Sequence, residues 1–108
     1  MAELKVSPLA AADMQEIGDY ISRELRNPEA AFSLIQRMHA AMSSLREYPQ
    51  MGAPLLAEEE QSAVYRYLVC GSYLIFYHGN EDTVYVDRVL YGRRNYMALL
   101  FGNEWKEE

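Results

Sequence analysis

The chain lacks most of the features that assign a protein to a function class directly. Its 108 residues include a single cysteine, Cys70, which excludes an internal disulfide and fits a reducing cytoplasm. No apolar run approaches the roughly 20 residues that a membrane-spanning helix needs. The N-terminus also lacks the basic segment followed by an apolar one that marks a signal peptide. The sequence therefore predicts a cytoplasmic protein that makes no use of a membrane.

Motifs that hold cofactors, metals or nucleophiles are also missing. The sequence contains no glycine-rich phosphate loop, no nucleophile elbow and no zinc-ligand spacing. His39 has no second His or Cys at metal-binding spacing, so we expect a partly exposed helix residue rather than a ligand. Cys70 stands in an apolar strand and is expected to be a small buried hydrophobic residue. The sequence thus predicts no metal and no cofactor.

Charge is unevenly distributed along the chain. The formal net charge is −6 and the sequence pI is about 4.9, which counts against autonomous binding to nucleic acid. Much of the acid lies in two places, residues 58–60 and the last five residues. From Arg66 to Tyr96, by contrast, the charges are roughly balanced: Arg66, Arg88, Arg93 and Arg94 against Glu81, Asp82 and Asp87. The sequence therefore allows a local basic face on a protein that is acidic as a whole.

Turn signals and hydrophobic periodicity predict one domain over residues 1–108. Ser7-Pro8 and Asn27-Pro28 are typical helix starts, with a capping side chain before a proline. The last strands are rich in Val, Ile, Tyr and Phe. The expected elements are a strand at Leu4–Val6, helices from Pro8 to about Leu25 and from Pro28 to about Tyr48, strands at Tyr65–Val69, Tyr73–His78 and Thr83–Tyr91, and a short C-terminal helical turn. This order predicts an α+β fold in which a helical hairpin packs on a small twisted antiparallel sheet.

Each predicted helix carries an apolar stripe. In the first helix the stripe comprises Leu9, Ala12, Ile17, Tyr20, Ile21 and Leu25, and Asp13, Glu16, Asp19 and Arg23 are expected on a solvated face. In the second helix it comprises Ala31, Ile35, Met38, Met42 and Leu45. The hairpin is expected to cover one face of the sheet and to leave the other free for a partner.

Alternation in the last strand predicts which residues share a face. Val84, Val86, Arg88 and Leu90 are expected on one face, and Tyr85, Asp87, Val89 and Tyr91 on the other. A register shift of one residue would move Arg66 and Arg88 to the opposite face, so both faces stay open for them.

Candidate functional residues gather near the end of the predicted sheet. They are Arg66, Tyr77, His78, Arg88, Arg93, Arg94 and Tyr96. Cleavage of a phosphodiester by a ribose 2′-hydroxyl needs a base, a cation for the developing charge and an acid for the leaving oxygen. Arginine supplies that charge, and Tyr and His can move protons or stack on bases.

Each candidate also has a structural alternative. Arg66 and Arg88 equally fit pairs with Asp87 or other carboxylates along the strands. Tyr77 fits a buried aromatic in mid-sheet, and His78 fits the end of a strand. The adjacent Arg93 and Arg94 have no matching acids nearby, so they indicate catalysis or the docking of an acidic partner.

Across nearly all of residues 5–101 the sequence resembles the toxins of type II toxin–antitoxin systems that unite RelE-like and ParE-like proteins. Four segments carry the resemblance: ISRELRNPEAAFSLIQRM, SLREYPQMGAPL, YRYLVCGSYLIFY and DRVLYGRRNYMALLF. It implies a small α+β fold and growth arrest when the protein is free. It also implies a cognate antitoxin that wraps an acidic and apolar segment over the sheet and its edges.

The resemblance leaves three mechanisms open. RelE-like members are metal-independent endoribonucleases that cleave mRNA in the ribosomal A site, and by position Arg94, Tyr96 and Arg93 would be catalytic, with Arg66, Arg88, Tyr77 and His78 binding the substrate or partner. Two departures weaken this interpretation: Leu74 replaces the arginine expected in the middle strand, and Glu58-Glu59-Glu60 replaces a lysine-rich stretch. ParE-like members, which GSYLIFY resembles more closely, inhibit DNA gyrase without a nuclease site. A degenerate member would only bind its antitoxin and help to repress its own operon.

Overall fold

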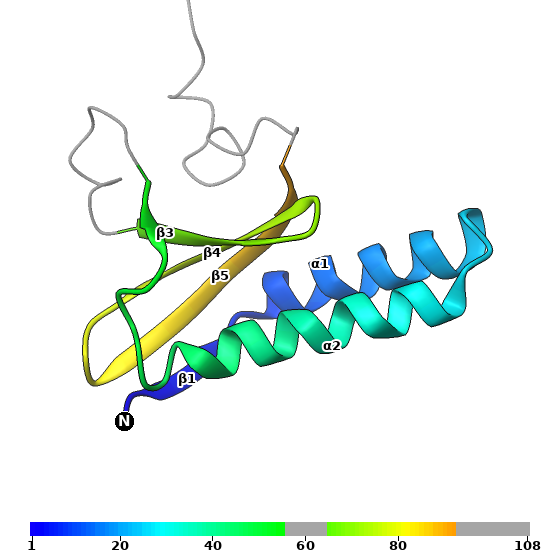
Figure 1. Ribbon diagram of the computed structural model, residues 1–108. Coiled ribbons are helices and arrows are strands. Elements are labelled where there is room, and N and C mark those ends of the chain that lie inside the picture. Colours follow the sequence, from blue (N-terminus) through cyan, green and yellow to red (C-terminus); the bar gives the residue numbers. More distant parts are fainter. Residues whose placement is uncertain (56–64, 93–108) are drawn as a thin grey trace, which may run out of the picture.

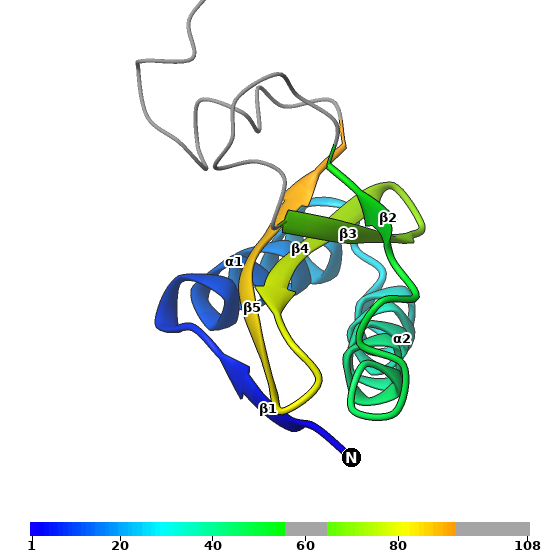
Figure 2. The ribbon, with the colours of Figure 1, turned by 90° about the vertical axis from the view of Figure 1, so that its left-hand side faces the viewer.

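A computed structural model describes residues 1–55 and 65–92, which form a helical hairpin on one face of a mixed sheet (Figures 1 and 2). The elements are β1 (Glu3–Val6), α1 (Pro8–Asp19), a π-helical turn (Tyr20–Glu24), α2 (Pro28–Ser44), β2 (Ala53–Pro54), β3 (Tyr65–Cys70), β4 (Tyr73–Gly79) and β5 (Thr83–Tyr91). The predicted α+β fold is confirmed, and β2 is an additional short strand. The predicted C-terminal helical turn lies outside the described residues.

The sheet is mixed rather than purely antiparallel. Its strand order is β1-β5-β4-β3-β2, and β1 pairs with β5 in parallel while the other neighbours are antiparallel. The short β1 covers only the first half of β5, from Thr83 to Val86. The second half of β5 therefore has an edge that another element must cover.

Both helices begin where the sequence predicts. The Ser7 side chain accepts a hydrogen bond from the Ala10 amide at 2.9 Å, and Asn27 Oδ1 accepts one from the Ala30 amide at 3.1 Å. The helix ends differ from the prediction. α1 widens into the π-helical turn, in which the Leu25 amide donates to the Tyr20 carbonyl five residues earlier, and α2 ends at Ser44 rather than near Tyr48.

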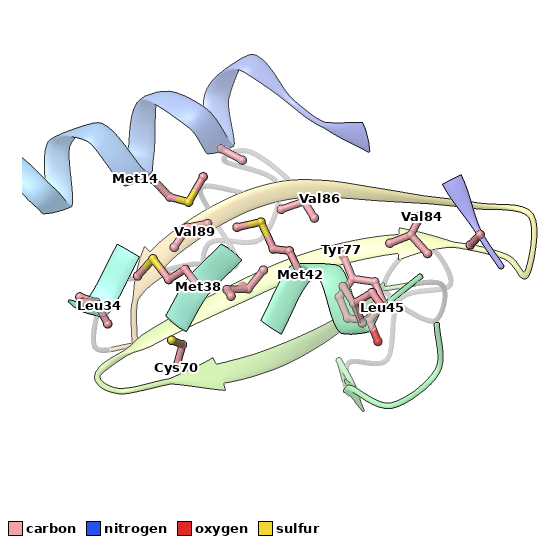
Figure 3. Packing of buried hydrophobic residues seen from close by; sticks show 13 residues of the cluster. Met14, Leu34, Met38, Met42, Leu45, Cys70, Tyr77, Val84, Val86 and Val89 are labelled. Atoms are coloured by element: carbon pink, nitrogen blue, oxygen red, sulfur yellow. The ribbon is translucent and has the colours of Figure 1, made fainter. Parts of the chain in front are cut away.

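The main core lies between the hairpin and the sheet (Figure 3). The α2 stripe is confirmed: Ala31, Met38, Met42 and Leu45 are buried and Ile35 packs against the same cluster. Cys70 is buried there, as predicted. A smaller cluster of Leu55, Phe76 and Leu90 belongs to the opposite face of the sheet, because Phe76 alternates with Ile75 and Tyr77 of the main core.

The predicted α1 stripe is wrong at several positions. Leu9, Tyr20 and Leu25 are 60%, 53% and 56% exposed, and Ala12 is exposed as well. Ala10 and Met14 are buried instead, and they lie two turns and one turn before Ile17, respectively. Ile17 and Ile21 pack on the core as expected. The reason is tertiary: β5 meets α1 along this row, and the tip of the hairpin extends beyond the sheet (Figure 1).

The predicted faces of β5 are wrong beyond Asp87, because the strand contains a β-bulge. Phe76 pairs with Arg88 and Tyr77 pairs with Val86, so Asp87 is an extra residue without a register partner. Beyond the bulge the alternation reverses. Val89 therefore joins Val84 and Val86 in the main core, whereas Leu90 belongs to the cluster on the opposite face.

Among the described residues, no helix combines the length and the apolar character needed to cross a membrane.

Candidate functional site

Four of the seven candidate residues fall within the described part of the chain: Arg66, Tyr77, His78 and Arg88. Arg93, Arg94 and Tyr96 lie outside it. The four described residues come from three adjacent strands, yet they form three separate sets of interactions.

Arg88 is held by a carboxylate on α1. Its Nε donates to Asp13 Oδ2 at 2.8 Å and its Nη2 donates to Asp13 Oδ1 at 2.9 Å, with the two side chains only 18% and 11% exposed. These hydrogen bonds raise the pKa of Arg88 above its usual value. The guanidinium could reach a phosphate only by giving up a bidentate pair with a largely buried carboxylate.

Asp13 has a second partner at the edge of the sheet. Its Oδ2 also accepts a hydrogen bond from the Val89 amide at 3.0 Å. Val89 lies in the half of β5 that β1 does not cover, so this carboxylate replaces the missing strand partner. The prediction that Asp13 lies on a solvated helix face is therefore wrong. No local pattern pointed to this role, because the partners are 75 and 76 residues away.

His78 pairs with the bulged Asp87. His78 Nδ1 lies 2.7 Å from Asp87 Oδ2, and the imidazole stacks on Tyr85 at a centroid distance of 5.1 Å. Tyr65 contacts the same imidazole, with its ring centroid 5.2 Å from that of His78. Burial raises the pKa of Asp87, and the hydrogen bond and charge of His78 oppose that rise. Burial together with the nearby Asp87 also raises the pKa of Tyr65.

Arg66 and Tyr77 hold the connection that follows α2. Arg66 Nη1 donates to the Gly52 carbonyl at 2.8 Å and to the Gln50 carbonyl at 3.3 Å. The Tyr77 hydroxyl accepts a hydrogen bond from the Gly52 amide at 2.9 Å. Tyr77 is buried in the main core and its pKa is raised by that burial, which the Gly52 hydrogen bond and Arg66 oppose. Both residues thus anchor a loop.

The described candidates therefore do not converge on one surface. Tyr77 points into the core beneath the helices, whereas its neighbour His78 lies on the opposite face, as alternation in a strand requires. Arg88 reaches around the edge of β5 to α1. Within residues 1–55 and 65–92, no group of three or more His, Cys, Asp or Glu side chains is placed to hold a metal ion.

This arrangement of a strand, a helical hairpin and a sheet is similar to the fold of a chain from a ParDE toxin–antitoxin system. A family model described as the ParE toxin of the type II toxin–antitoxin system parDE matches residues 4–96. Because that match covers most of the sequence, the chain belongs to the ParE toxin family.

Solved structures agree on the fold. A chain from the chromosomal ParDE toxin–antitoxin system of P. aeruginosa superimposes with a TM-score of 0.69 at 22% identity, covering 84% of this chain and 96% of that one. A single-residue mutant of YafQ from E. coli superimposes with a TM-score of 0.50 at 12% identity, covering 94% of this chain and 100% of that one. A comparison with curated proteins finds no match.

Proposed function

We propose that this ParE-family toxin arrests growth by binding its target rather than by cleaving RNA, and that its target is DNA gyrase, which the sequence resemblance associates with ParE-like members. The observation that carries the proposal is that the four described candidate residues are already engaged in interactions within the chain. Arg66, Tyr77, His78 and Arg88 each hold another part of the same chain through a hydrogen bond or ion pair. A nuclease would need such groups free to meet a phosphate.

Leu74 supports the same interpretation. It occupies the strand position where the nuclease branch of the family is expected to carry an arginine. Its side chain packs against the cluster of Phe76 and Leu90 on the helix-free face. An apolar side chain there offers no charge to a phosphorane.

The partner in the resting state is a cognate antitoxin. Support for this comes from membership of a toxin family defined by its toxin–antitoxin pair. The antitoxin would hold the toxin inactive, and loss of the antitoxin would release it.

The test is a supercoiling assay with purified toxin and gyrase. We expect the toxin to inhibit supercoiling, and stoichiometric antitoxin to restore it. Unchanged supercoiling, combined with cleavage of ribosome-bound mRNA by the same preparation, would refute the proposal. Full growth after induction of the toxin without antitoxin would instead indicate a degenerate member that only binds its partner.

The sequence-based prediction that Arg93, Arg94 and Tyr96 carry out catalysis lies outside the described residues and stays a prediction. Arg94→Ala separates the two mechanisms. If the toxin is a nuclease, this substitution abolishes cleavage while the far-UV circular dichroism spectrum stays unchanged. If it binds gyrase, cleavage is absent in both proteins, and Arg94→Ala changes only the strength of inhibition.

A further inference from the structure

β1 forms one edge of the sheet, and its outer side is not paired within the described part of the chain. It stands first in the strand order β1-β5-β4-β3-β2, so its only strand neighbour among the described residues is β5 (Figure 2). The amides of Glu3 and Ser7 donate to carbonyls on the β5 side. Because the backbone groups of successive strand residues point in opposite directions, the amides and carbonyls of Leu4 and Val6 point outward. An edge of this kind is a template for a further strand.

Two side chains of opposite charge stand on this edge strand. Glu3 and Lys5 lie on the helix-free face of the sheet, because Leu4 between them packs on the main core. Lys5 Nζ lies 4.0 Å from Glu3 Oε2, and the two side chains are 54% and 67% exposed. An ion pair that is this long and this exposed contributes little to the fold. Both charges are therefore free to meet a partner.

The spacing of these charges fits an antiparallel copy of the same strand. If two β1 strands pair about a two-fold axis at Leu4, each Glu3 stands opposite Lys5 of the other copy. The outward backbone groups of the two Leu4 residues then form a hydrogen-bonded pair. Glu3 and Lys5 fall on non-hydrogen-bonded pairs, where facing side chains lie closest. An axis at Glu3 or at Lys5 would instead place like charges directly opposite each other, which is destabilising.

Exposed apolar side chains lie at both ends of β1. Met1 precedes the strand, Val6 ends it and Leu9 lies in the first turn of α1, and all three are exposed. In the antiparallel pair, the N-terminus of each copy meets the start of α1 in the other copy. Covering these side chains would remove apolar surface from water, which adds to the few hydrogen bonds that a strand of four residues can supply.

We propose that this protein self-associates through β1, with two antiparallel copies of the strand joining their sheets into one continuous sheet. The partner is a second copy of the chain because the charge pattern of Glu3 and Lys5 is complementary to itself in this register. The inference goes beyond the proposed function, since it concerns how the toxin assembles and not which target it binds.

An exchange of charges tests the register. Glu3→Lys and Lys5→Glu each convert both opposite-charge pairs into like-charge pairs, whereas the double variant Glu3→Lys/Lys5→Glu restores opposite charges with their signs exchanged. Glu24→Lys and Arg23→Glu are the matched controls. They make the same changes at exposed residues near the tip of the hairpin, far from β1 (Figure 1).

A proline at Val6 tests the hydrogen bonds of the edge separately. The Val6 amide points outward, so Val6→Pro removes a donor from the outer edge and leaves the hydrogen bonds between β1 and β5 in place. We expect this variant to associate more weakly than the wild type while its circular dichroism spectrum stays unchanged.

The measurement is sedimentation equilibrium of the purified full-length toxin, which gives the dissociation constant of the dimer. We expect the wild type to be dimeric, and Glu3→Lys and Lys5→Glu each to weaken the dimer at least about tenfold. The double variant is expected to return to within about threefold of the wild type, and the two controls to change the constant less than about threefold. Thermal unfolding verifies that each variant is folded.

Three results would overturn the inference. The first is a wild-type toxin that stays monomeric over the whole concentration range. The second is a dimer that neither single charge variant weakens, because that dimer would use another surface. The third is a double variant that stays as weak as the single variants, because the two charges would then not face each other. Gyrase inhibition is measured independently, so none of these results decides the proposed function.

Discussion

At the scale of single residues, Asp13 links two parts of the chain that are far apart in sequence. It pairs with Arg88 and accepts a hydrogen bond from the Val89 amide, so that it satisfies both a largely buried charge and an uncovered strand edge. Removing an acceptor of this kind costs more than the bond itself contributes, because the remaining charge loses its partner without regaining water.

Removing this carboxylate tests that account. We expect Asp13→Ala to lower the free energy of unfolding by about 2–3 kcal/mol, because Arg88 and the Val89 amide both lose their partner. Urea unfolding followed by circular dichroism measures the change. Asp19→Ala removes an exposed carboxylate from the same helix and is expected to change stability by less than about 0.5 kcal/mol. Equal effects of the two substitutions would contradict the role assigned to Asp13.

Gly52 is a second residue whose identity the tertiary structure requires. It is buried under Tyr77, and a Cβ there would lie 2.6 Å from the Tyr77 hydroxyl and 2.7 Å from the Tyr67 carbonyl. Neither neighbour can move freely, since one is a buried ring and the other is strand backbone. The loop that Arg66 and Tyr77 hold therefore accommodates no side chain at this position.

This contact predicts opposite outcomes for two glycines. Gly52→Ala is expected to lower the free energy of unfolding by about 2 kcal/mol, because the loop must shift away from Tyr77. Gly18→Ala, inside α1, meets only Ile35 at 3.8 Å and is expected to raise it by about 0.5–1 kcal/mol through its better helix propensity. Thermal or urea unfolding of both variants provides the measurement, and a neutral Gly52→Ala would show that the loop yields easily.

At the scale of secondary-structure elements, the bulge in β5 decides what the sheet presents on each face. It inserts Asp87, whose carbonyl accepts a hydrogen bond from the Ser7 side chain at 2.8 Å, while the Ser7 amide donates to the Val86 carbonyl. The same Ser7 caps α1. The bulge thus joins the start of the hairpin to β5 and directs the Asp87 carboxylate to His78.

The half-buried Asp87 carboxylate predicts a pH dependence of stability. Its pKa in the folded state is raised above the ordinary value of 3.8, so the folded state binds this proton more tightly than the unfolded state does. Stability from this group is therefore fully present below that value and is lost as the pH rises through the folded pKa. Asp87→Asn keeps an acceptor for His78 but cannot titrate.

Urea unfolding as a function of pH measures this dependence. Wild-type stability is expected to fall relative to that of Asp87→Asn as the pH rises from 3.8 through the raised pKa of Asp87. Above that window the difference becomes constant. Parallel curves throughout would mean that Asp87 titrates alike in the folded and unfolded chains.

At the scale of the whole molecule, the hairpin is longer than the sheet that it covers. Its base packs on β5 and β3, and its tip extends beyond them with Tyr20 and Leu25 exposed (Figure 1). These exposed side chains add no stability to the free toxin, because apolar surface stabilises a fold only when it is removed from water. The proposed gyrase target is tested on the intact protein, in the supercoiling assay.

Much of the architecture follows from local sequence signals. Ser7-Pro8 and Asn27-Pro28 mark both helix starts, and the apolar stripe of α2 corresponds directly to its buried face. The turn residues between Tyr65 and Tyr91 place β3, β4 and β5 within a residue or so of their observed bounds. These features are encoded within a few residues of where they act, so periodicity and capping chemistry reveal them.

Other features depend on contacts between distant parts of the chain. The parallel β1, the bulge at Asp87, the role of Asp13 and the loop held by Arg66 and Tyr77 all arise from partners far apart in sequence. The sequence by itself determined most of the elements, because those follow from local patterns, and its resemblance to known toxins indicated the family. Only the tertiary structure decided which arginines are engaged and which apolar residues stay exposed, because a side chain's partner depends on where distant elements meet.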